Sequence, residues 1–278
     1  MAAARVLYPF ALEWRHARRL RAGPDGIVIG AEPIDLARSG APAVLLLHGG
    51  GDTPQSLRGL AEFLFTRGYA VRVPLLADHG RTLRNLRQFD ALKWRAQVRA
   101  EIEQMRTTQP WLAIVGQSVG GALALDAAAS NQGVRALVLL APWVAMPQFV
   151  RRLARWSRVW GPLFPYLPSL GGHSIHDPVA RSQALTQGLV TPEMLRAIAA
   201  VADMADRSLP RVTVPTLTIQ SREDPRIAEP VAQRGFDRLG ASEKKLEWMV
   251  NTGHVISVDY GRDRVHTLAA DWLDSHRG

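Results

Sequence analysis

The amino-acid sequence predicts an α/β fold, in which a mostly parallel central sheet is flanked by helices. Short apolar runs alternate along the chain with longer segments of helical period, which is the pattern of βαβ units. Two of the apolar runs end in glycine-rich turns. A length of 278 residues would allow two small domains, but it also suits one large α/β domain, and we expect the latter.

Four short, mostly apolar runs are the clearest candidates for buried strands, and they lie at residues 44–47, 112–115, 136–140 and 215–219. The first three contain no polar residue, as is expected of strands that are buried on both faces. Between them, apolar side chains recur at helical spacing and predict crossover helices. The two sets are Leu57, Leu60, Ala61, Phe63 and Leu64, and Trp94, Val98, Ile102 and Met105. A last set predicts a final amphipathic helix on the sheet, and it consists of Val265, Leu268, Ala269 and Trp272.

One long segment, residues 143–209, interrupts this rhythm, and we expect no strand in it. Many large apolar side chains are punctuated there by prolines and a glycine pair, which predicts short helices joined by turns. A further helix is expected to start at Thr191-Pro192-Glu193, where Thr191 can cap it and Pro192 fits its first turn. We therefore predict a core of residues 1–142 and 210–278 with a helical cap insertion, 143–209.

The net charge of +9 would attract nucleic acid if the basic residues were clustered. They are spread along the chain, so we expect no nucleic-acid partner. The densest basic stretch, Arg151 to Arg158, alternates with apolar residues and predicts an amphipathic helix, although a membrane-surface binder remains an alternative. No apolar run approaches the ~20 residues that span a bilayer, and the first residues lack a signal peptide. We predict a cytoplasmic protein without stable membrane insertion, and leave its oligomeric state open.

The strongest chemical signal is Gly116-Gln-Ser118-Val-Gly120, between a buried strand and a helix of small residues. A serine on so tight a strand-to-helix turn needs glycine at 116 and 120, because side chains there would collide with the neighbouring strand and helix. The turn would expose the Ser118 hydroxyl as a nucleophile and place the Val119 N–H where it can stabilise an oxyanion. The alternative is an ordinary glycine-rich turn.

A second signal is His48-Gly49-Gly50-Gly51, which ends the first apolar run. Glycines let backbone amides approach a substrate closely, and Gly50 is our choice for the second oxyanion donor. A phosphate-binding loop is disfavoured, since no Lys-Ser/Thr follows the glycines. We expect His48 to be structural.

A serine nucleophile needs a base and an orienting carboxylate. Asp224 directly follows a predicted strand, with Glu223 as its nearest rival, and both would be surface residues if the turn were only structural. His254 lies beside Gly253 in a loop after another probable strand, whereas His16, His266 and His276 are expected on the surface. The chain has no cysteine, which excludes thiolate nucleophiles and thiolate metal sites. The order Ser118, Asp224, His254 is the order of α/β-hydrolase triads.

These segments resemble the bacterial carboxylesterases and monoacylglycerol lipases of the α/β-hydrolase superfamily. The matching pieces are LLLHGGG, LLADHGRTL, GQSVGG, TIQSREDPRI and NTGHVISVDYGRDRV. The resemblance implies an α/β-hydrolase fold, a triad of Ser118, Asp224 and His254, an oxyanion hole of Gly50 and Val119, and a cap over an acyl pocket. Members often carry an aromatic residue where this chain has Gly50. HGGG also occurs in hormone-sensitive-lipase-like esterases, but their G-D-S-A-G motif is absent here.

We therefore predict a serine esterase that acts on a small lipophilic ester through an acyl-enzyme and needs no metal or organic cofactor. The aromatic and leucine side chains of the insertion would either line an acyl pocket or simply pack the cap. A thioesterase, amidase, carbon–carbon bond hydrolase or perhydrolase could use the same triad. Epoxide and haloalkane hydrolases are disfavoured, because they need an aspartate where Ser118 stands. A catalytically silent protein that binds a lipophilic ligand is the non-enzymatic alternative.

Overall fold

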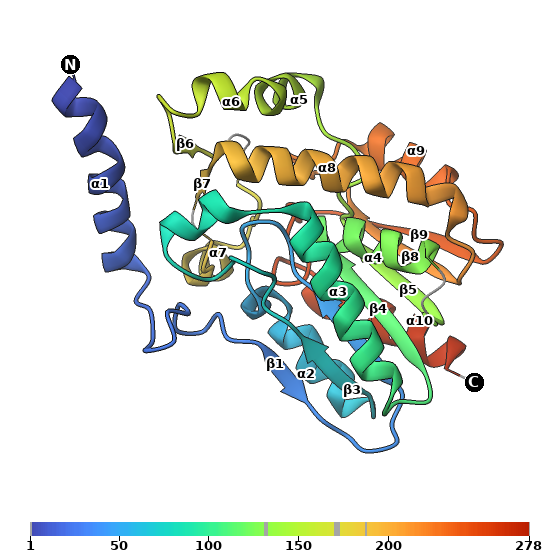
Figure 1. Ribbon diagram of the computed structural model, residues 1–278. Coiled ribbons are helices and arrows are strands. Elements are labelled where there is room, and N and C mark those ends of the chain that lie inside the picture. Colours follow the sequence, from blue (N-terminus) through green and yellow to red (C-terminus); the bar gives the residue numbers. More distant parts are fainter. Residues whose placement is uncertain (1, 131–132, 170–172, 187, 278) are drawn as a thin grey trace.

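The structure, a computed structural model, describes residues 2–130, 133–169, 173–186 and 188–277. Its centre is a seven-stranded sheet with the order β1-β3-β2-β4-β5-β8-β9 (Figure 1). Neighbouring strands run parallel, except that β1 pairs antiparallel with β3. The strands are β1 (Ile34–Leu36), β2 (Ala43–Leu47), β3 (Ala70–Val73), β4 (Leu112–Gln117), β5 (Ala136–Leu140), β8 (Thr216–Ser221) and β9 (Lys244–Met249). This mostly parallel sheet confirms the predicted fold class.

The four strands expected from apolar runs are β2, β4, β5 and β8, which are neighbours at the centre of the sheet. Every residue of these four strands is buried. In β2 and β5 every residue is apolar, which is the continuous signal of a strand covered on both faces, whereas β8 also buries two threonines, a glutamine and a serine. The outer strands β1, β3 and β9 are partly exposed and include charged residues, and their boundaries were not predicted.

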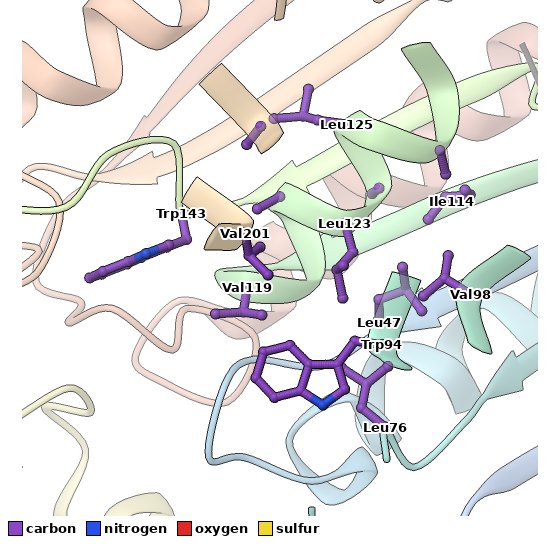
Figure 2. Close-up of a cluster of buried hydrophobic side chains, with 14 of the residues drawn as sticks. Leu47, Leu76, Trp94, Val98, Ile114, Val119, Leu123, Leu125, Trp143 and Val201 are labelled. Atoms are coloured by element: carbon purple, nitrogen blue, oxygen red, sulfur yellow. The ribbon is translucent and has the colours of Figure 1, made fainter. Parts of the chain in front are cut away.

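Helices cover both faces of the sheet and make two separate hydrophobic cores. One face carries α2 (Arg58–Thr66) and α10 (Arg262–His276), the predicted final helix. The other face carries α3 (Ala91–Arg106), α4 (Val119–Ala129) and α8 (Pro192–Ser208), with α9 (Glu229–Asp237) beside β8. Figure 2 shows this second core, in which Leu47 and Ile114 of the sheet lie close to Trp94, Val98 and Leu123 of the helices.

The segment between β5 and β8 is mostly helical, as predicted, but it also contains a short strand pair. Its helices are α5 (Gln148–Arg155), α6 (Ser157–Trp160), α7 (Pro178–Gln183) and α8. β6 (Leu167–Pro168) pairs antiparallel with β7 (Leu189–Val190), so the expectation of no strand was wrong. A two-residue pair has no alternation that a sequence could reveal. Thr191 caps α8 as expected, and α8 packs along α4. The division into core and cap, with 143–209 as the cap, remains a prediction.

An N-terminal helix, α1 (Ala2–Arg19), was not anticipated, and Figure 1 shows it standing beside the rest of the molecule. Glu13 connects this helix to the rest of the protein, because its carboxylate accepts hydrogen bonds from Tyr166 Oη at 2.8 Å and from Arg84 Nε at 2.8 Å. Nowhere in the described part of the chain is a helix both long and apolar enough to span a bilayer.

Of three histidines expected on the surface, two are buried and the third is partly exposed. His16 and His266 are buried, because α1 and α10 turn them inward, and burial lowers the pKa of both. The His276 side chain is only 11% exposed and contacts Glu243.

Candidate active site

Ser118 lies at the sharp turn between β4 and α4. Its backbone has a φ of 53° and a ψ of −116°, a conformation that residues with a side chain rarely adopt. The Ser118 N–H donates to Leu140 O at 2.9 Å, and the Ser118 carbonyl accepts from Trp143 N at 2.9 Å. The neighbouring strand β5 and the residues after it therefore hold the strained turn in place, with the serine hydroxyl at the C-terminal edge of the sheet.

The two glycines of the Gly-x-Ser-x-Gly turn have no room for a side chain. A Cβ on Gly116 would lie 2.5 Å from Gly120 O, and a Cβ on Gly120 would lie 2.1 Å from Leu47 O. Both obstacles are backbone atoms, which cannot rotate away. The glycines let β4, α4 and the end of β2 approach closely enough to form the turn.

His254 stands between the serine and a carboxylate. Its Nε2 lies 2.8 Å from Ser118 Oγ, and its Nδ1 lies 2.7 Å from Asp224 Oδ2. All three residues are buried, with exposed fractions of 9% or less. The arrangement brings together residues from three loops at one edge of the sheet, 136 and 30 positions apart.

Asp224 is held as an anion. Burial alone would raise the pKa of its carboxyl, but His254 and the backbone N–H groups of Arg226 and Ile227 favour the charged form, and the pKa lies below its usual value. The neighbouring Glu223 points away, because its carboxylate accepts the Asn251 N–H at 2.7 Å and is half exposed. The structure thus places Asp224, and not its rival, beside His254.

Gly50 and Val119 lie side by side next to the serine. A Cβ on Gly50 would be 2.9 Å from Val119 Cγ2, and both residues line the same cavity as Ser118. Val119 is the first residue of α4, where N–H groups have no partner within the helix. His48 contacts the glycine run through its Nδ1, which lies 2.9 Å from Gly49 O, while its Nε2 accepts the Leu76 N–H at 3.0 Å. Burial lowers the pKa of His48 to about 4, so the ring is neutral.

The loop that carries His254 is fixed by the segment before α7. Ser174 O accepts the backbone N–H groups of His254 at 2.8 Å and Val255 at 2.9 Å. A Cβ on Gly253 would lie 2.5 Å from the same oxygen, so glycine is required there for a close approach.

Asp259 completes this junction, and the sequence analysis missed it. Its carboxylate accepts four backbone N–H groups, from Gly253 at 2.6 Å and from His176, Asp177 and Tyr260 at 2.8 Å each. Burial opposes its ionisation, but these four bonds hold the pKa of Asp259 below its usual value. His176 and Asp177 are 83 and 82 positions away from Asp259 in the chain, so no sequence motif could have predicted these hydrogen bonds.

Asp52 is a second carboxyl group near the triad that sequence reasoning did not identify. It is 7% exposed and lines the cavity, and its Oδ2 lies 3.4 Å from Gln117 Nε2. A Cβ placed on Gly49 would lie within 4 Å of both Asp52 Oδ2 and Ser118 Cβ. Burial raises the pKa of Asp52 to about 6, and hydrogen bonds and the proximity of His254 only partly oppose this.

Replacement of Asp52 by Asn is expected to stabilise the protein above pH 6. The folded pKa of about 6 exceeds the ordinary value of 3.8, so the folded protein binds this proton more tightly than the unfolded chain does. Ionisation between about pH 4 and pH 6 therefore lowers the stability of the wild type. The variant should gain about 3 kcal/mol in free energy of unfolding at pH 8, and nothing below pH 4. Urea unfolding at both pH values measures this.

The matched control is Asp35→Asn, because Asp35 is exposed on β1. A gain in the Asp52→Asn variant that is the same at pH 8 and pH 4, or one that Asp35→Asn reproduces, would contradict the buried ionisation.

A cavity of about 500 Å³ lies over Ser118. Its size suits a small organic substrate. The apolar part of its lining consists of Val119, Trp143, Ile175, Ala184, Leu189, Val190, Met194, Ile198 and Val255, besides glycines. The large side chains of α5, α6 and the following turn were candidates for this lining, but they lie outside it. Four of them are exposed, namely Phe149, Trp156, Leu163 and Phe164.

The chain is similar to a known family and to known lipases and esterases. The family model described as serine aminopeptidase, S33, matches residues 39–260. The thermostable monoacylglycerol lipase of Bacillus sp. (strain H-257) is 27% identical over 252 residues, which are 91% of this chain and 98% of that protein. The carboxylesterase of Bacillus subtilis (strain 168) is 23% identical over 239 residues, covering 85% of this chain and 94% of that protein.

A solved structure from work on the metagenome-derived lipolytic enzymes LipS and LipT superposes with a TM-score of 0.83. It is 26% identical and covers 90% of this chain and 100% of its own. These similarities confirm the predicted α/β-hydrolase fold and the predicted resemblance to monoacylglycerol lipases and carboxylesterases. Helix α1 precedes the region that the family model matches.

Proposed function

Because the chain belongs to the serine aminopeptidase (S33) family of hydrolases, we propose that it forms an acyl-enzyme on Ser118. It is a carboxylic ester hydrolase of the lipase and esterase group, as the sequence predicts. The observation that supports the role of Ser118 is the position of His254, which lies within hydrogen-bond distance of both Ser118 and Asp224.

In the first step, neutral His254 accepts the proton of the Ser118 hydroxyl at Nε2 while Oγ attacks the ester carbonyl. The backbone N–H groups of Gly50 and Val119 stabilise the tetrahedral oxyanion. Asp224 holds the other ring nitrogen of His254 as a donor and stabilises the imidazolium. His254 then gives its proton to the leaving alcohol, and the acyl-enzyme remains.

In the second step, water takes the place of the serine hydroxyl. His254 removes a proton from this water as it attacks the acyl-enzyme, and the same two amides stabilise the second oxyanion. Return of the proton to Ser118 Oγ releases the acid. The chain's own residues provide a nucleophile, a base and an oxyanion hole for every step.

The substrate that we propose is a small ester bound in the cavity over Ser118. The relatives named monoacylglycerol lipase and carboxylesterase support an ester, and the apolar side of the cavity supports an acyl group of modest size. The cytoplasmic location that the sequence predicts, without a nucleic-acid partner, is part of this proposal.

The test is to measure turnover of p-nitrophenyl esters with acyl chains of two to twelve carbons, before and after treatment with a fluorophosphonate. We expect turnover that is lost when one fluorophosphonate binds per chain, with the added mass on the peptide that contains Ser118. Peptides that contain the other serines serve as internal controls. No turnover of any ester would refute the proposed ester cleavage, and labelling elsewhere would refute the proposed nucleophile.

A further inference from the structure

The cavity has a cationic wall that the proposed mechanism does not use. Arg226 and Arg181 both line it, on the side of β8 and α7. Arg226 is partly buried, its Nε donates to Ser174 Oγ at 2.8 Å, and its Nη2 lies 3.2 Å from Ser169 Oγ. Arg181 Nη1 lies 3.4 Å from Ile175 O. These oxygen contacts hold the two guanidinium groups in place, and the Arg226 charge also interacts with the Asp224 carboxylate.

Hydrogen bonds connect Arg226 to the loops that carry His254 and Asp224. Ser174, which accepts its Nε–H, also accepts the backbone N–H of His254 through its carbonyl. The backbone N–H of Arg226 itself donates to Asp224 Oδ1 at 2.7 Å, and the other carboxylate oxygen of Asp224 lies 2.7 Å from His254 Nδ1. Arg226 and Ser118 line the same cavity, so an ester bound at Ser118 could also contact Arg226.

The opposite side of the cavity carries the other sign of charge. Asp52 follows β2 and Arg226 follows β8, and the strand order places Ser118, after β4, between them. An anionic group of a bound ester would be repelled by Asp52 and attracted toward Arg226. The cavity is therefore polarised along the sheet edge, although a purely lipophilic substrate would need no such arrangement.

We propose that Arg226, supported by Arg181, binds a carboxylate carried by the substrate, so that the preferred substrate is an anionic ester. This inference rests on the proposed function and names its substrate class. A guanidinium matches the geometry of a carboxylate and forms charge-assisted hydrogen bonds to it. The carboxylate can belong to the acyl part or to the alcohol part of the ester, and the experiment separates these two sources.

The experiment compares two pairs of esters that differ in one negative charge. The acyl pair is p-nitrophenyl hemiglutarate and p-nitrophenyl pentanoate, and the alcohol pair is 4-acetoxybenzoate and its methyl ester. We expect the wild type to have the higher kcat/KM for the anionic member of one pair. The ratio of kcat/KM for the anionic ester to kcat/KM for the neutral ester of that pair should fall by about 10- to 100-fold in Arg226→Gln, because a charge-assisted hydrogen bond is lost. Turnover of the neutral ester should fall much less than turnover of the anionic ester.

The matched control is Arg222→Gln, since Arg222 belongs to the same turn but is exposed and pairs with Glu229. Its ratio should equal that of the wild type. An equal loss for both members of a pair in Arg226→Gln would overturn the proposal and indicate a structural role. If the wild type hydrolyses the neutral esters and shows no preference for the anionic ones, this inference is overturned and the proposed esterase function stands. If the wild type hydrolyses none of the four esters, both proposals are overturned.

A second measurement does not depend on the folding of a variant. Glutarate should inhibit wild-type turnover of p-nitrophenyl pentanoate competitively, and pentanamide, which is neutral, should inhibit at least 10-fold more weakly. Equal inhibition by the two compounds would also overturn the proposal.

Discussion

Replacement of Ser118 by Ala is expected to lower kcat for p-nitrophenyl esters by about 10⁴- to 10⁶-fold. His254→Ala should cause a loss of similar size, because without the base nothing accepts the proton of the Ser118 hydroxyl as it attacks. The double variant should be no slower than either single variant, since the two side chains act as one unit in proton transfer and attack. Steady-state rates for the wild type and the three variants give this comparison directly.

Two other residues serve as controls for these substitutions. Ser182 is exposed on α7, and His276 is at the end of α10, so Ser182→Ala and His276→Ala should keep near wild-type rates. Losses that multiply in the Ser118→Ala/His254→Ala double variant would show that the two groups act independently, which is incompatible with the proposed mechanism.

Replacement of Gly120 by Ala is expected to lower the free energy of unfolding by about 3 kcal/mol or more, or to prevent folding. The added Cβ would lie 2.1 Å from Leu47 O and 2.7 Å from His48 O. Relief would require α4 to move away from the end of β2, and both elements are part of the buried centre of the protein. Urea unfolding followed by circular dichroism measures the loss.

Gly40→Ala is the matched control for this substitution. Gly40 has a φ of 67°, which disfavours alanine, but a Cβ there would have no atom within 4 Å. Its cost should therefore be only the conformational penalty of about 1 to 2 kcal/mol. If Gly120→Ala is no less stable than Gly40→Ala, the close contact between α4 and β2 does not constrain the turn as we describe.

The central part of the fold could be predicted from the sequence because burial on both faces leaves a continuous apolar signal. This holds for β2, β5 and most of β4, whereas β8 is also entirely buried but has four polar residues among its six. It does not hold for β9, where charged residues face solvent, or for the two-residue strands β6 and β7, which are too short for any pattern. Helix α1 was missed although it is long, because it packs on the protein only in part and has a proline inside.

The sequence by itself determined the turn at Ser118. Its requirements are local, since two glycines and one serine within five residues, after an apolar run, are enough to specify a strained strand-to-helix turn. It also determined that Asp224 and His254 follow later strands, and so lie at the same edge of a parallel sheet.

Only the tertiary structure decided which carboxylate faces His254, because Asp224 and Glu223 are adjacent and the packing of their loop sets the direction of each side chain. It also brought Asp52, Asp259 and Arg226 to the site. Asp259 and Arg226 form hydrogen bonds to residues more than fifty positions away in the chain. The raised pKa of Asp52 comes from its burial, next to Gln117 at the end of β4. Contacts of this kind arise when distant loops pack together, and no local pattern of residue types records them.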